Sequence, residues 1–158
     1  MSRSLATILL TLLLTACIPL TPAPAVEPIA TAGLPPRQEN WTIRFTQSGG
    51  IMGMTREMEI LSDGQLKAAD DRTGREATSQ LTEAELTRLQ NLVNNLAYNA
   101  KSGPTTCADC FIYTLEISSG SGKPFTAEAD DVSLEASGLS PLVEYLRTLM
   151  ERSLNTQG

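Results

Sequence analysis

The sequence of 158 residues contains no histidine. This absence removes imidazole metal ligands, the Ser-His and Cys-His nucleophile pairs and the commonest general base of enzymes. Most familiar hydrolytic designs are therefore excluded, although other kinds of enzyme are not. We expect a non-enzymatic protein that needs no cofactor.

Basic residues are also scarce, because 12 Lys and Arg stand against 18 Asp and Glu, a net charge of −6. Removal of an N-terminal signal over residues 1–16 would delete only Arg3 among the charged residues, leaving 11 basic residues and a net charge of −7. An acidic protein is repelled by the phosphates of nucleic acids and by anionic lipid surfaces. We therefore expect no nucleic-acid partner.

Cys17, one of only three cysteines, closes the tetrapeptide Leu-Thr-Ala-Cys at residues 14–17. Before it lie one basic residue, Arg3, and an apolar stretch over residues 5–14, which are the parts of a secretory signal. The tetrapeptide resembles the bacterial lipobox, in which the Cys thiol receives a diacylglyceryl group and a peptidase cleaves before it. The resemblance implies that residues 1–16 are a lipoprotein signal peptide. It also implies that acylated Cys17 attaches the protein to a membrane, on the extracytoplasmic face of the cell envelope.

Two other interpretations of this segment remain open: an ordinary secretion signal in which Cys17 is incidental, and an uncleaved membrane anchor. The apolar stretch is shorter than the ~20 residues of a spanning helix, and no cluster of Lys and Arg follows it, so cleavage and lipidation fit better. Residues 17–38 instead carry six prolines among Ala and Thr. Such a composition favours extended conformations with a reach of ~3.1 Å per residue. It predicts a tether between the membrane and the rest of the chain.

Residues 39–158 have the size of one small domain. Strict alternation of apolar and polar residues from Trp41 to Thr46 predicts a half-buried strand, and Asp63-Gly64 predicts the turn of a hairpin. The expected strands cover residues 41–46, 54–60, 65–68, 111–117 and 124–129.

Two segments carry helix signals. Thr82 and Glu85 have the spacing of a capping box, and an apolar stripe at helical spacing follows them to about Tyr98. Near the C-terminus, Ser140 is expected as an N-cap with Pro141 at the first helical position, ahead of a second apolar stripe. The sequence therefore predicts an α+β domain: an antiparallel sheet of about four to five strands with two amphipathic helices packed on one face.

Four segments in this order resemble the emfourin family of protealysin inhibitors. They are Ser48-Gly49-Gly50-Ile51-Met52-Gly53, then Leu81-Thr82-Glu83-Ala84-Glu85-Leu86 with Leu92-Val93, then Phe111-Ile112-Tyr113-Thr114-Leu115, and the closing helix from Leu139 to Leu149. The resemblance covers nearly all of residues 39–158 and implies an inhibitor of thermolysin-like zinc metallopeptidases. The chain departs from the family in its lipobox, its tether and the insert Cys107-Ala108-Asp109-Cys110.

Cys107 and Cys110 are the two thiols that remain if Cys17 is acylated. In an exported protein such an even pair favours a small intrachain disulfide. Three alternatives stay open. A structural zinc site needs about four ligands, where this chain offers one CxxC and no His. A redox dithiol normally lies at a helix N-terminus, whereas a strand follows here. The third alternative is a pair of inert, reduced thiols.

The glycine-rich segment that contains Gly49, Gly50, Ile51, Met52 and Met54 has two interpretations. The glycines supply the positive φ that a hairpin or bulge requires, which alone would explain them. The apolar residues beside them would also suit a peptidase pocket for bulky hydrophobic side chains, which the loop would occupy in a substrate-like way. Exposure of Ile51 and Met52 favours this partner-binding interpretation. Their burial favours a structural or assembly lipoprotein that contacts other envelope proteins without inhibitory activity.

Overall fold

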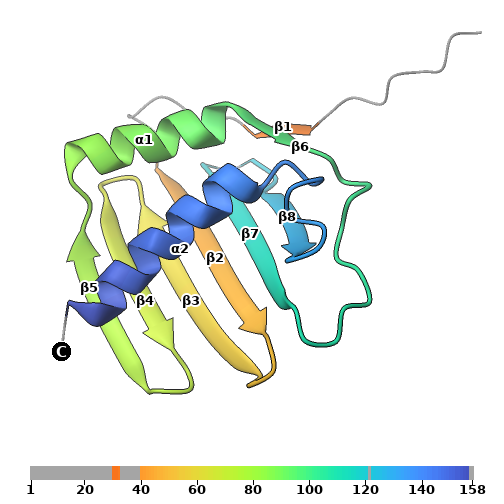
Figure 1. Ribbon diagram of the computed structural model, residues 1–158. Coiled ribbons are helices and arrows are strands. Elements are labelled where there is room, and N and C mark those ends of the chain that lie inside the picture. Colours follow the sequence, from red (N-terminus) through yellow and green to blue (C-terminus); the bar gives the residue numbers. More distant parts are fainter. Residues whose placement is uncertain (1–29, 33–39, 121, 157–158) are drawn as a thin grey trace, which may run out of the picture.

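The computed structural model describes residues 30–32, 40–120 and 122–156. At its centre is an antiparallel sheet of six strands in the order β5-β4-β3-β2-β7-β8, so the chain is an α+β protein, as the sequence predicts. The strands of this sheet are β2 (Trp41–Gly49), β3 (Met54–Leu61), β4 (Gln65–Asp70), β5 (Arg75–Gln80), β7 (Phe111–Ser119) and β8 (Phe125–Asp130). A separate ribbon pairs β1 (Ala30–Ala32) with β6 (Leu96–Tyr98), and the helices are α1 (Glu83–Asn94) and α2 (Ser140–Asn155) (Figure 1).

The prediction of four to five strands is wrong, because the sheet has a sixth strand, β5, at one edge. β5 lacks the apolar alternation of a half-buried strand, since Ala77 is the only buried residue among its six. It forms because its backbone pairs with β4 along its whole length, from Gln65 opposite Gln80 to Asp70 opposite Arg75. β4 and β5 thus form a hairpin that turns through residues 71–74, and β5 is held by backbone pairing and not by an apolar face.

One face of the sheet carries the core. Successive side chains of a strand point to opposite faces, and Phe45 of β2 and Leu115 of β7 lie opposite each other on the buried face, each 1% exposed. α2 crosses this face against β4 and β5, where the hydroxyl oxygens of Ser79 and Ser153 lie 3.1 Å apart (Figure 1). The core therefore lies between this face and α2.

α1 begins as the sequence predicts. Thr82 Oγ1 accepts a hydrogen bond from Glu85 N, and Glu85 Oε2 accepts one from Thr82 N, which completes the capping box. The predicted extension of this helix to Tyr98 is wrong. The helix ends at Asn94, and Asn95 takes the C-cap position, where its backbone N–H makes the last helical hydrogen bond to Asn91 O and its side-chain amide donates to the same oxygen. The residues that follow form β6.

α2 begins one residue earlier than the sequence predicts. Ser140 is its first residue rather than its N-cap, and Leu139 takes the cap position without a side-chain hydrogen bond. The Ser140 hydroxyl instead donates to Glu144 Oε1 over 3.0 Å. Pro141 lies in the first turn, where its missing N–H costs nothing.

Little of the predicted N-terminal region falls within the described residues. Of residues 1–38, only β1 is described, and it pairs in antiparallel register with β6 from Ala30 opposite Tyr98 to Ala32 opposite Leu96. The predicted signal peptide, Cys17 and the rest of the predicted tether lie outside the described residues. The structure therefore adds a strand to a segment for which the sequence predicts only an extended tether.

Candidate functional site

The turn that joins β2 to β3 covers residues 50–53. Gly49, Gly50 and Gly53 have positive φ values of 97°, 69° and 57°, and Gly53 N donates to Gly50 O over 2.9 Å. A Cβ atom makes positive φ costly. The chain reversal is thus enough to account for the three glycines.

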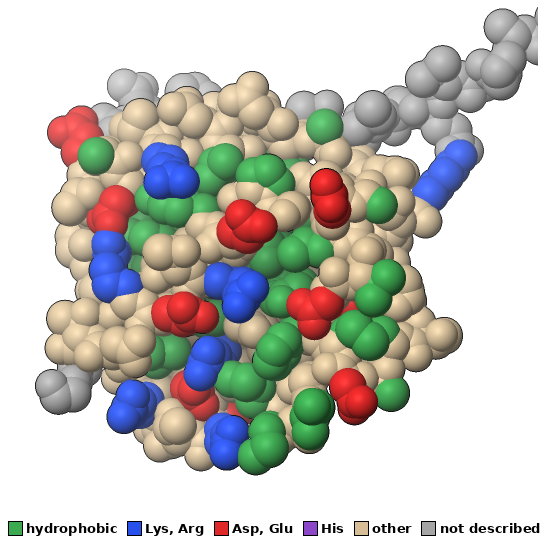
Figure 2. All heavy atoms as spheres, viewed as in Figure 1, with side chains coloured by type: hydrophobic (Ala, Val, Ile, Leu, Met, Phe, Trp, Pro, Cys, Tyr) green, Lys and Arg blue, Asp and Glu red, His purple; other side chains and the backbone are tan. Residues whose placement is uncertain are grey.

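Ile51 and Met52 lie at the tip of this turn. Ile51 is 84% exposed and Met52 is 61% exposed, so neither contributes to the core. Figure 2 shows hydrophobic side chains gathered at this end of the molecule. Met54 differs from them, because it is the first residue of β3, pairs with Gly49 and is half-buried. The exposed part of the predicted binding loop is therefore Ile51 and Met52.

The turn is fixed to the segment that precedes β7. Gly50 N donates to Cys110 O over 3.1 Å. A Cβ atom on Gly49 would lie 2.7 Å from Cys110 O, and one on Gly50 would lie 2.8 Å from the ring of Phe111. The absence of side chains at both glycines therefore permits a close approach as well as the chain reversal, and the tip is held on a defined base.

Cys107 and Cys110 are joined in a disulfide, with their Cα atoms 5.5 Å apart. Cys107 is exposed and Cys110 is half-buried. The bridge closes a loop of few residues directly before β7, so the entropy it removes from the unfolded chain is small. Its position is more informative, because Cys110 is the residue that contacts the glycine turn.

Asp130, at the end of β8, fastens the loop before the disulfide to the sheet. Its Oδ2 accepts hydrogen bonds from the backbone N–H and the hydroxyl of Thr105, and its Oδ1 accepts one from Ser133 N over 2.8 Å. These hydrogen bonds, that from the Thr105 hydroxyl most of all, hold the pKa of Asp130 well below its usual range. Sequence reasoning missed this residue, although an Asp followed three residues later by Ser is a signal for such a turn.

The neighbouring residue, Asp131, is hydrogen-bonded to the first residues of β7. Its Oδ2 accepts a hydrogen bond from Phe111 N over 2.8 Å, and its Oδ1 accepts one from the Tyr113 hydroxyl over 2.6 Å. Burial and this hydrogen bond raise the pKa of Tyr113 to about 12. The phenol is therefore a neutral donor at neutral pH, and its hydrogen bond to Asp131 links the start of β7 to the segment after β8.

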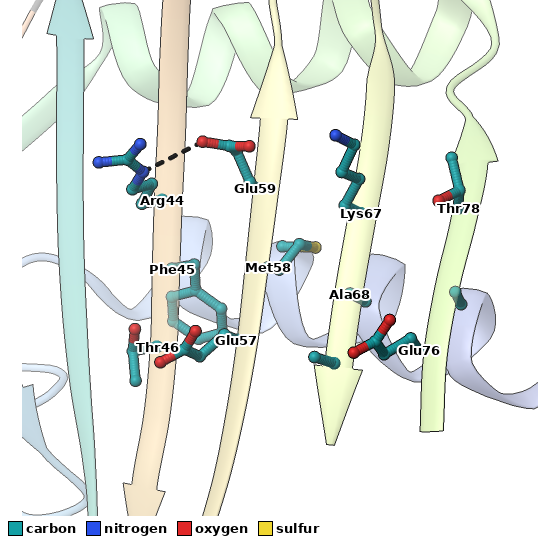
Figure 3. Close-up of a pocket in the computed structure, with 12 residues that line it drawn as sticks. Arg44, Phe45, Thr46, Glu57, Met58, Glu59, Lys67, Ala68, Glu76 and Thr78 are labelled. Carbon is teal, nitrogen blue, oxygen red and sulfur yellow. Dashed lines mark hydrogen bonds and ion pairs between the residues drawn. The ribbon is translucent and has the colours of Figure 1, made fainter. Parts of the chain in front are cut away.

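The face of the sheet opposite α2 carries a second candidate, a shallow hollow of about 420 Å³. Arg44, Glu59, Lys67 and Thr78 lie side by side across β2 to β5 (Figure 3). Arg44 Nε lies 3.1 Å from Glu59 Oε1, and Arg44 Nη1 lies 3.8 Å from Glu116 Oε1. Exposed ion pairs of this kind contribute little stability. Arg44, Glu59 and Lys67 thus form a row of alternating charges in which Arg44 is already paired with Glu59 and Glu116.

Within the described residues, no group of three or more Cys, Asp or Glu side chains is placed to hold a metal ion. None of the described helices is long and apolar enough to cross a membrane. A scan of protein-family models and a search of curated proteins each found no match to this chain. Among the described residues, the turn at residues 50–53 combines exposed apolar side chains with a base fixed by a hydrogen bond to Cys110 O.

Proposed function

We propose that the protein is a lipid-anchored protein of the cell envelope whose domain binds another protein through the turn at residues 50–53. The exposure of Ile51 and Met52 is the observation that supports binding through the turn, and the resemblance of residues 14–17 to the lipobox supports the anchor. Two bulky apolar side chains stand on a turn whose base is fixed to Cys110 and Phe111. A loop held in one conformation before binding loses little entropy on binding. It suits a partner with an apolar pocket.

The proposed partner is a thermolysin-like zinc metallopeptidase, which the domain inhibits. The resemblance to emfourin supports this choice, and the exposed tip has the chemistry of a substrate segment that fills a hydrophobic pocket. Fixation of the turn would slow cleavage, because the backbone cannot relax into the geometry of the products. Residues 107–110 then act as a support for the loop and not as a redox centre.

We also infer that α1 and α2 cover the same face of the sheet. Leu89 and Val93 of α1 are fully buried in the core cluster. The Tyr145 hydroxyl of α2 donates to Glu85 O over 3.1 Å, and the Arg88 guanidinium lies 4.6 Å from the centre of the Tyr145 ring. This arrangement leaves the turn at residues 50–53 clear of both helices (Figure 1).

An inhibition assay with residues 18–158, which retain β1, tests the proposal. The wild-type protein should inhibit thermolysin acting on a small peptide substrate. Met52→Ala should raise the inhibition constant about thirtyfold, since truncation of a buried anchor costs ~2 kcal/mol. The free energy of unfolding should not change. Thr126→Ala, at an exposed position of β8, is the matched control and should inhibit like the wild type.

Two other results would count against inhibition through the turn. Full peptidase activity in the presence of micromolar wild-type protein would remove the inhibitor proposal. A loss of ~2 to 5 kcal/mol of unfolding free energy in Met52→Ala would show a core role instead.

A further inference from the structure

Val132 is the third exposed large hydrophobic side chain of the described residues, at 65% exposure. It lies at the same end of the sheet as the turn at residues 50–53. Phe111, the first residue of β7, pairs with Gly49 on one side, and its carbonyl oxygen accepts a hydrogen bond from Asp131 N on the other. Neighbouring strands lie ~4.8 Å apart. One strand, β7, therefore lies between the two exposed apolar segments, so β2 and β8 are two strand spacings apart, about 10 Å.

The disulfide loop lies between these two segments. Cys110 contacts the glycine turn through its carbonyl oxygen and directly precedes Phe111. Two carboxylates belong to the same end: Asp109, exposed within the disulfide loop, and Asp131 beside Val132, whose two oxygens accept hydrogen bonds from Phe111 N and the Tyr113 hydroxyl. The apolar side chains therefore have acidic neighbours, which a partner with basic groups around an apolar recess would match.

The end of the sheet that carries the turn at residues 50–53 and Val132 lies opposite the place where the N-terminal segment joins the domain. β1 pairs with β6, and the Tyr98 ring of β6 contacts Phe125 at the start of β8, with ring centres 5.7 Å apart. β2 begins at that end and runs nine residues to Gly49, about 30 Å at ~3.4 Å per residue. Figure 1 shows β1 and the β2–β3 turn at opposite ends of the molecule. The exposed apolar residues thus lie at the end of the domain far from the point where the N-terminal segment joins it.

We propose that residues 50–53, the Cys107–Cys110 loop and Val132 form one binding surface, the distal surface, whose partner is a protein in the aqueous phase with an apolar recess bordered by basic groups. This inference rests on the proposed function and extends it, because it adds two segments to the contact and gives the domain an orientation. A lipid bilayer does not suit the distal surface, because the N-terminal segment joins the domain at the other end. In addition, anionic lipid headgroups would repel the flanking carboxylates.

The test measures inhibition of thermolysin by the full chain, purified in a mild detergent. Val132→Ala should raise the inhibition constant about fivefold, the effect of one moderate interface contact. Asp109→Asn should weaken binding about twofold, and more at low salt than at high salt, as a charge at the rim of an interface does. Thr126→Ala is again the control and should leave inhibition unchanged.

The outcomes separate the two proposals. If Met52→Ala weakens inhibition while Val132→Ala and Asp109→Asn match the control, the distal surface is wrong and the proposed function stands. If the wild-type chain does not inhibit, both are wrong. A third arm sediments residues 18–158, which carry no lipid, with vesicles of phosphatidylcholine and phosphatidylglycerol. Sedimentation that Met52→Ala reduces would overturn the assignment of an aqueous protein partner, whereas its absence supports that assignment.

Discussion

Substitution of Gly49 by Ala should destabilise the protein by about 1.5–3.5 kcal/mol. The positive φ of 97° contributes ~1–2 kcal/mol of this cost, because a Cβ atom makes such a backbone unfavourable. The rest arises because the new Cβ would lie 2.7 Å from Cys110 O. Relief of that contact must move β2 away from the start of β7 and weaken the Gly50 N to Cys110 O hydrogen bond, itself a net ~0.5–1.5 kcal/mol.

Gly53→Ala is the matched control, because Gly53 also has positive φ, at 57°, but no atom lies within 4 Å of the position that a Cβ atom would take there. It should cost only ~1 kcal/mol. Urea unfolding followed by the fluorescence of Trp41, the single tryptophan and only 2% exposed, measures both variants. Equal losses of unfolding free energy would refute the close approach of the turn to Cys110.

Three further predictions concern a buried acid and the cysteines. Because the pKa of Asp130 is lowered from its ordinary 3.8, its contribution to stability should be full above about pH 4 and lost as the pH falls further. Urea midpoints of Asp130→Asn should therefore be lower than wild type at pH 7 and decline less steeply in acid; parallel declines would count against this role. Non-reducing mass analysis should show residues 107–110 lighter by two hydrogens than the reduced form, whereas two thiols that react with alkylating reagent would contradict the disulfide. Cys17→Ser should abolish acylation, and an acylated, membrane-bound mutant would refute lipidation at that residue.

The elements that local sequence determines could be predicted. The capping box of α1 involves Thr82 and Glu85, three residues apart, and the alternation in β2 and β7 arises from one buried face. β5 and β6 could not be predicted in this way. β5 is an edge strand with a single buried residue, and Leu96 continues the helical spacing of α1 although the helix has already ended. β5 depends on backbone pairing with β4 in a hairpin, and β6 depends on pairing with the distant strand β1.

The candidate site, too, could be predicted only in the part that local sequence determines. The turn at residues 50–53 follows from its glycines, and its exposed tip is one of two alternatives that the sequence leaves open. The contacts that fix its base could not be predicted, because Gly50 and Cys110 are far apart in the chain, as are Thr105 and Asp130. Val132 has no local signal that marks it as exposed.

Amide hydrogen exchange of residues 18–158, alone and with excess thermolysin, tests most directly whether the turn binds the peptidase. Ile51 and Met52 lie at the exposed tip of a short turn, so their amides should exchange fast in the free protein and much more slowly in the complex. The amides of Gly50 and Gly53 already donate hydrogen bonds in the free protein. The amides of strands β4 and β5, which line the hollow on the sheet face opposite α2, should exchange at the same rate in the free protein and in the complex. Protection confined to β4 and β5, or no protection at Ile51 and Met52 under conditions that inhibit the enzyme, would contradict binding through the turn.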